Sequence, residues 1–306
     1  MNFSGLQHIR QAVHTLNPNH VRELGERELK VALYAATPAD YGQLEDFLVQ
    51  GLGTERRRDA LGLIHRGPDP KKVLDYDLAV YDESVLAPRR ALVFHRNRPQ
   101  RLVSTVLDNF DTTVALPLAK NFPPFRAPYI TRVIRTVSRE NAIFSMATAL
   151  PDIIPSLVEI PWALTEFASD TAVLTANQIK MAFILAAASD REVGYREQKS
   201  EIAMLIGGAF GWRALARQLI GKIPFGGGLI PKAAIAYAAT KLIGTSLERY
   251  YRIGYTYTRE EREEIYAEAF QHGQRVAGSI LKKLRPDLAE KNRVFHDANS
   301  HQSTSL

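Results

Sequence analysis

The stretch from Ser169 to Tyr251 constrains the fold more than any other part of the chain. It contains long runs of Ala, Ile, Leu and Gly at helical spacing, and a glycine knot at Phe225–Gly228 interrupts them. Each run is almost apolar enough to enter a membrane, yet each carries a Lys, Gln or Asn near its middle. Such runs are typical of a buried helical core or of a membrane-associated helical hairpin.

Polar residues inside these runs help to decide between a buried helical core and a membrane-associated hairpin. A membrane-spanning helix needs about 20 predominantly apolar residues, and a charge at its centre costs about 2.5–3.5 kcal/mol. The interruptions in residues 171–188 and 229–244 are Asn177, Gln178, Lys180, Lys232 and Lys241. No segment therefore matches a clean span. Both a packed soluble domain and a peripheral or hairpin association with the membrane stay open.

The same polar residues also predict a feature of the helical core. Residues that interrupt an apolar helix face hydrogen-bond with neighbouring helices when they are buried. We expect such a core polar network to include Asp170, Asn177, Gln178 and Lys180.

Composition limits the function classes. The chain has 306 residues, enough for one large or two ordinary domains, and its net charge of +6 indicates a mildly basic surface. Because it contains no Cys, disulfides, thiol catalysis and cysteine metal sites are excluded. The N-terminal residues lack the apolar core of a signal peptide. We therefore expect a cytoplasmic protein, located at the inner face of the plasma membrane if it contacts lipid.

The first 120 residues carry the pattern of an α/β layer. Five short apolar runs are predicted strands, at residues 29–35, 61–65, 76–81, 91–95 and 112–118. Thr37 and Pro38 are the N-cap and first residue of a predicted helix, and a second helix is expected from Pro99 to Leu107. Strands that alternate with helices predict a small, mostly parallel sheet.

After Pro123 and Pro124 the pattern becomes helical. We expect helices near residues 126–149, 155–168, 170–188, 196–208, 212–221, 229–252 and 258–285. Largely buried core positions are predicted at Leu174, Ile179, Phe183, Leu205, Leu219, Ile230, Ile235 and Leu242. The expected organisation is an N-terminal helix and linker (1–27), an α/β domain (28–123), an all-α helical domain (124–285) and a disordered tail (286–306).

No catalytic constellation is recognisable. A phosphate-binding loop needs closely spaced glycines and a Lys-Ser/Thr pair after the first strand, and neither follows Ala35. Asp82 occupies the position of a metal-holding carboxylate, but without such a loop it is expected to be a solvated loop residue. The histidines lack metal-ligand spacing. We therefore assign no catalytic residue, no metal site and no cofactor.

The helical part resembles the YcjF-like, GTPase-associated domain family. The matching stretches are SDTAVLTANQIKMAFILAAA, IGGAFGWRALARQLIGKIPFGGGLIPKAAIAYAATKLIG and LERYY, within residues 140–252. The resemblance implies a helical module that accompanies Era-like GTPase domains and is often membrane-associated. In its light, residues 28–120 look like a degenerate G-domain, with LKVALYA as the first strand, YDLAVYD as the third and TTVALPL as the last. The Asn-Lys-x-Asp motif that reads guanine is missing.

Together these features predict a non-enzymatic bacterial protein of the GTPase-associated type. Its helical module would bind a protein partner, such as a GTPase or a second copy, or the membrane surface. The predicted contact residues lie around the glycine knot: Lys222, Phe225, Gly226, Gly227, Gly228, Leu229, Ile230 and Lys232. The basic charge is diffuse and lacks aromatic stacking residues, so nucleic acid is not the expected partner. The alternative is a nucleotide-binding or hydrolysing protein with an unorthodox phosphate site.

Overall fold

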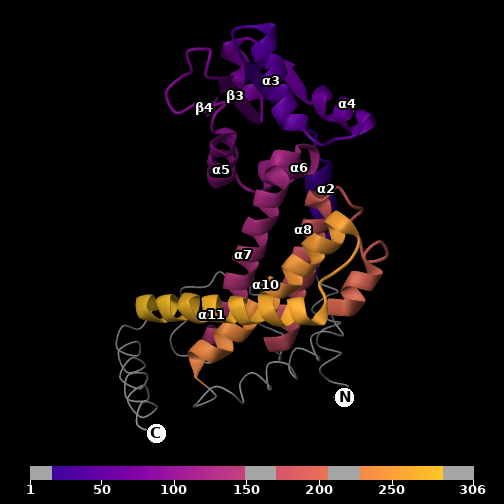
Figure 1. The fold of residues 1–306 in the computed structure, drawn as a ribbon, viewed down its shortest axis with the longest axis vertical. Helices are drawn as coiled ribbons and strands as arrows, with labels where there is room; N and C mark the ends of the chain where they lie inside the picture. Colours follow the sequence, from indigo (N-terminus) through magenta and orange to yellow (C-terminus); the bar gives the residue numbers. More distant parts are fainter. Residues whose placement is uncertain (1–15, 149–169, 206–227, 285–306) are drawn as a thin grey trace.

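A computed structural model describes residues 16–148, 170–205 and 228–284 of the chain (Figure 1). It shows a small parallel sheet with helices, followed by a largely helical region, which confirms the predicted fold class. The sheet half contains α2 (Pro18–Glu26), β1 (Val31–Tyr34), α3 (Pro38–Val49), α4 (Thr54–Gly62), β2 (Ile64–Arg66), η1 (Pro70–Asp75), β3 (Leu78–Asp82), β4 (Leu92–Phe94), α5 (Pro99–Asn109) and α6 (Thr112–Asn121). The helical half contains α7 (Pro123–Ala147), α8 (Asp170–Ala188), α10 (Leu229–Ile253) and α11 (Arg259–Leu284).

The four strands lie in the order β2-β1-β3-β4, and every pair is parallel. Val31 lies opposite both Ile64 and Leu78, so the central strand β1 is hydrogen-bonded on both sides. All four residues of β1 are buried. Parallel strands that are covered on both faces read as near-continuous apolar runs, which is why this strand could be recognised in the sequence.

The predicted fifth strand is wrong, because residues 112–118 form the helix α6 instead. Asp111 caps this helix by accepting a hydrogen bond from the Thr113 amide, and Pro117 lies inside it. A short apolar run with three β-branched residues suits a strand or a buried helix equally. The presence of Pro117 in this run argues against a strand, because proline is not found in a central strand.

Pro117 also explains a contact between α6 and the N-terminal part. Proline has no amide hydrogen, so the carbonyl oxygen of Thr113, four residues earlier, loses its helical partner. The guanidinium of Arg27 donates to this oxygen at 3.1 Å and also pairs with Asp77. Helix α2, which the sequence analysis missed within its linker, ends just before Arg27 and packs on α6 and α8. Asn17 caps α2, with Pro18 as its first residue.

The helical half is joined to the sheet half by one continuous apolar core. Helix α7 runs from the sheet half into the helical half, where α10 and α11 cross each other (Figure 1). Small residues determine how closely these helices approach one another. A Cβ atom added at Gly273 of α11 would lie 3.0 Å from the backbone of Ala234 in α10, and one added at Gly244 would lie 2.7 Å from Ile134 in α7. The helices therefore approach closely only because glycine occupies these positions.

The predicted core positions are confirmed in part. Ile179, Phe183, Leu205 and Leu242 are almost completely buried. The other described positions, Leu174, Ile230 and Ile235, are only partly buried. Leu219 lies outside the described residues, as do the predicted helices 155–168 and 212–221.

Candidate functional site

The strand order defines one place where a ligand site is expected. The chain passes from β1 to β2 on one side and then crosses to β3 on the other side of β1. In open α/β sheets, ligands bind beyond the carboxyl ends of the strands at such a reversal. Here that place lies between the ends of β1 and β3, close to the start of α3.

Three charged side chains meet at this crevice: Asp40 of α3, Asp82 at the end of β3 and Arg96 just after β4. The Nη2 atom of Arg96 donates to Asp82 Oδ1 at 2.8 Å and also to Asp40 Oδ1. Both carboxylates are buried, and Asp82 is entirely inaccessible to solvent. We call these three residues the crevice cluster.

The crevice cluster corrects the expectation for Asp82, which is not a solvated loop residue. It ends a buried strand, and its side chain lies on the same face of the sheet as Leu78 and Val80. One of its oxygens, Oδ2, has no hydrogen-bond partner. Arg96 lies in an arginine-rich stretch of the sequence, which by itself indicates only a basic surface. Its pairing with Asp40 spans 56 positions, so no local pattern announced it.

The start of α3 is closed by a capping box. The Thr37 amide donates to Asp40 Oδ2 at 3.0 Å, and the Asp40 amide donates in return to Thr37 Oγ1 at 3.3 Å. A helix N-terminus attracts anions because its first amides point outward without partners. Here a carboxylate of the helix itself occupies that place. The predicted N-cap role of Thr37 is therefore confirmed, and an anion from solution would meet the negative charge of Asp40.

Electrostatics keep both carboxyl groups ionised. The hydrogen bond from Thr37, followed by that from Arg96, lowers the pKa of Asp40 below its ordinary value. Burial acts to raise the pKa of Asp82, but hydrogen bonds from Ser84 and Arg96 outweigh it, and the net shift is downward. The same two carboxylates raise the pKa of Arg96. The crevice cluster is thus a stable ion-pair arrangement rather than a poised acid or base.

The loop that follows β3 adds further hydrogen bonds around the crevice cluster. Ser84 Oγ accepts a hydrogen bond from the Ala36 amide at 3.2 Å, and the Ser84 amide donates to Asp82 Oδ1 at 2.9 Å. His95 Nδ1 lies 3.1 Å from Glu83 Oε2. These contacts tie the ends of β1, β3 and β4 to one another. Within the described ranges, no group of three His, Asp or Glu side chains is arranged to hold a metal ion.

The predicted contact residues around the glycine knot are only partly described. Gly228 and Lys232 are exposed, whereas Leu229 and Ile230 are partly buried against a cluster that contains Met146 and Ile280. The Lys232 Nζ donates to Thr148 Oγ1 at 3.2 Å. Lys222, Phe225, Gly226 and Gly227 lie outside the described residues. The packing of Leu229 and Ile230 favours a structural role for these two side chains.

A second polar site lies inside the helical half. Asn141 of α7 donates to Thr240 Oγ1 of α10 at 2.9 Å and accepts from Asn177 of α8 at 2.8 Å. Gln178 donates to the same Thr240 oxygen at 3.1 Å. We call these four residues the amide network. They confirm the predicted core network for Asn177 and Gln178, whereas Lys180 is exposed and the Asp170 side chain is not described.

Asn141 and Thr240 were not predicted from the sequence, although the spacing of buried residues in α7 indicated Asn141. Ile130, Ile134, Ser138 and Asn141 are all buried, at intervals of four, four and three residues. Asn141 therefore continues the inward face of the helix.

Of the described helices, one stretch, Thr171–Ala188, is long and apolar enough to cross a membrane, and 72% of it is buried inside the protein. A core helix of a soluble protein passes the same test.

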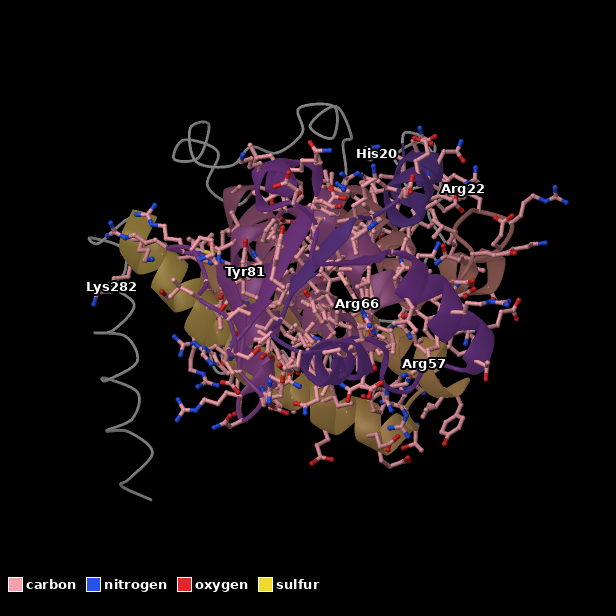
Figure 2. All side chains as sticks on the ribbon, turned by 90° about the horizontal axis from the view of Figure 1, so that it is seen from above. His20, Arg22, Arg57, Arg66, Tyr81 and Lys282 are labelled. Atoms are coloured by element: carbon pink, nitrogen blue, oxygen red, sulfur yellow. The ribbon has the colours of Figure 1, made fainter. Side chains whose placement is uncertain are left out.

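Figure 2 views the molecule from the sheet end. It shows Tyr81 of β3 and Arg66 of β2 apart from each other over the sheet, with Arg57 further toward the rim on the Arg66 side.

Comparison with known proteins adds no further constraint, because no family model, curated protein or solved structure matches the chain. The resemblance to the YcjF-like family and to a degenerate G-domain therefore stays a prediction.

Proposed function

We propose that this chain is a non-enzymatic binding protein of the GTPase-associated type, in which side chains of the protein close the nucleotide crevice. One observation carries the proposal. Arg96 bridges Asp40 and Asp82 at the sheet position where an open α/β fold binds its ligand. The site supports stability through internal ion pairs and offers no group for chemistry.

Charge and space at the crevice both support this reading. Only three residues separate β1 from α3, too few for a loop that wraps phosphates. The first turn of α3 is capped by Asp40, and a second carboxylate, Asp82, lies beside it. A nucleotide phosphate would face two negative charges, and the nearest cation is already shared between them.

The proposed binding role is assigned to surfaces of the protein rather than to a cavity with chemistry. The helical half would present its partner surface near Lys232, at the start of α10. Leu229 and Ile230 pack inward there, which favours a protein partner such as a GTPase over insertion of these side chains into lipid. The protein would act in the cytoplasm.

A second candidate is a nucleotide-binding protein with an unorthodox phosphate site. The strand order favours it, because the crevice has the correct topology. The side chain of Arg96 is also more exposed than those of its two partners, so it is the member of the cluster that can swing toward solvent.

Titration calorimetry with GTP and ATP in the presence of Mg²⁺ separates the two candidates. The proposal predicts no saturable heat for the wild-type protein, and the same result for Arg96→Gln, which weakens the closure without adding a phosphate site. Micromolar or tighter affinity in the wild-type protein contradicts the proposal. Loss of that affinity in Arg96→Gln would then identify Arg96 as the phosphate contact and support the second candidate.

A further inference from the structure

The two faces of the sheet are covered differently. A crossover between parallel strands is right-handed, so the connection from β1 to β2 covers one face and the connections from β2 to β3 and from β3 to β4 cover the other. The first connection contains α3 and α4, whereas the other two consist of η1 and a loop at residues 83–91. One face of this parallel sheet thus lacks the α-helical layer that such sheets normally carry.

Aromatic side chains fill this thinly covered face. Tyr34 and Tyr81 stack with ring centroids 4.6 Å apart, and Tyr76 packs beside them. Val85 and Ala87 of the loop also pack on this cluster. The loop is therefore held against the sheet by its apolar residues, and η1 is held there by Tyr76, the residue that follows it. This packing fixes where the remaining side chains of the two connections emerge.

Each of the two connections presents one leucine to solvent. Leu74 of η1 is 93% exposed and Leu86 of the loop is 99% exposed, the highest values among the described large apolar residues. Side chains this exposed do not line a groove, so they do not fit the ridge of a partner helix. Protruding apolar side chains suit a deformable apolar phase, and the interface of a lipid bilayer is such a phase.

Basic residues accompany both leucines. Lys71 and Lys72 precede Leu74, and Arg89 and Arg90 follow Leu86 at the tip of a turn that the Ala91 amide closes on the Pro88 carbonyl. All four cations are exposed, and within the described residues none forms an ion pair.

The acidic residues of these connections leave a positive balance. The Glu83 carboxylate faces His95 and Arg96, and Asp69 caps η1 through the Lys71 amide. Asp75 is the remaining exposed carboxylate near Leu74. Arg96 is already shared between Asp40 and Asp82, so Glu83 counts with Asp69 and Asp75, whereas Asp77 is paired with Arg27. Four cations therefore stand against three carboxylates, and the positive balance favours an anionic partner.

We propose that these two connections form a membrane-docking surface, in which Leu74 and Leu86 enter the interface of an anionic bilayer and the four cations contact its headgroups. The inference deepens the proposed binding role by naming a surface and its partner. Figure 1 places β3 and β4 at the end of the molecule opposite α11, so the helical half stays free for a protein partner.

Vesicle co-sedimentation tests this proposal with the full chain. Wild-type protein should bind phosphatidylserine–phosphatidylcholine vesicles at low salt, should not bind pure phosphatidylcholine vesicles, and should be released by added salt. Replacing Lys71, Lys72, Arg89 and Arg90 with Gln should weaken binding by nearly three orders of magnitude, at about fivefold for each cation. Leu74→Ser with Leu86→Ser should weaken it by at least about tenfold.

The control variants use exposed positions elsewhere on the molecule. One control replaces Arg58, Arg139, Arg275 and Lys282 with Gln, and another combines Met204→Ser with Ile253→Ser. All of these residues are exposed, so melting curves should stay unchanged. The proposal is overturned if wild-type protein remains in the supernatant, which leaves a protein as the partner, or if control and loop variants lose binding equally. Neither outcome depends on nucleotide affinity, so the proposed function can fail separately.

Discussion

The two halves of the molecule stabilise their internal polar groups in different ways. The sheet half gathers two buried carboxylates around one partly exposed guanidinium at the end of its strands. The amide network of the helical half is neutral instead, with amides and hydroxyls of α7, α8 and α10 bonded to one another. Charges remain where water still reaches one partner, whereas the deeper site uses groups that lose less hydration on burial.

The halves also differ in how they are packed. Branched side chains such as Val31 and Leu33 fill the space between the sheet and its helices. The crossing of α10 with α11 instead depends on small residues such as Ala234 and Gly273. Mutations that test cavities, crowding, hydrogen bonding and charge should therefore have graded effects.

The largest effect is expected in the centre of the helical half. Phe183 of α8 is almost fully buried and meets Tyr195 edge-on, with ring centroids 5.4 Å apart. Phe183→Ala should lower the free energy of unfolding by about 3–5 kcal/mol, because it leaves a cavity. Ile235→Ala should cost clearly less, because Ile235 is only partly buried. Urea unfolding measures both, and equal losses would contradict the packing described here.

Phe183 also illustrates what the sequence could reveal. Its position in a long apolar run with helical spacing was enough to predict burial. The helical spacing likewise identified α8, α10 and α11 to within about two residues. The contacts of the crevice cluster could not be predicted from the sequence. Asp40, Asp82 and Arg96 come from three separate segments, and the strand order brings them together. The strand order is a long-range property that local patterns do not encode.

A second test concerns the close crossing of α10 and α11. Gly273→Ala should cost about 1–3 kcal/mol, because the new methyl group would press on the backbone of Ala234. Gly278→Ala in the same helix is the matched control, since nothing lies within 4 Å of its added Cβ. The control should stabilise the protein by up to about 1 kcal/mol through helix propensity. Thermal unfolding that ranks the two variants in the opposite order would show that the crossing is looser than described.

The amide network should respond to the loss of a single partner. Asn141→Ala leaves the Asn177 amide and the Thr240 hydroxyl without one of their contacts, at a cost of about 1–3 kcal/mol. Asn109→Ala serves as a control, because Asn109 is exposed and should change stability by no more than about 0.5 kcal/mol. Chemical denaturation distinguishes them. Equal values would mean that water replaces the network at no cost.

The smallest effect is expected from the charges of the sheet half, because water screens the partly exposed Arg96. The pKa values of Asp40 and Asp82 are lowered in the folded protein. Their contribution to stability is therefore complete above the ordinary carboxyl pKa of about 3.9, and it is lost as the pH falls through the lower folded values. Arg96→Leu should be less stable than wild type at pH 7, and the difference should shrink in acid. A difference that stays constant with pH would contradict the ion-pair account.

A double-mutant cycle between Arg96 and Asp82 tests the closed crevice most directly. Unfolding free energies at pH 7 are measured for wild type, Arg96→Leu, Asp82→Asn and the double variant. If Arg96 closes the crevice by pairing with Asp82, the loss caused by Arg96→Leu should be much smaller when Asp82 is already Asn. If the two losses simply add, the side chains do not interact in solution, and the crevice is open.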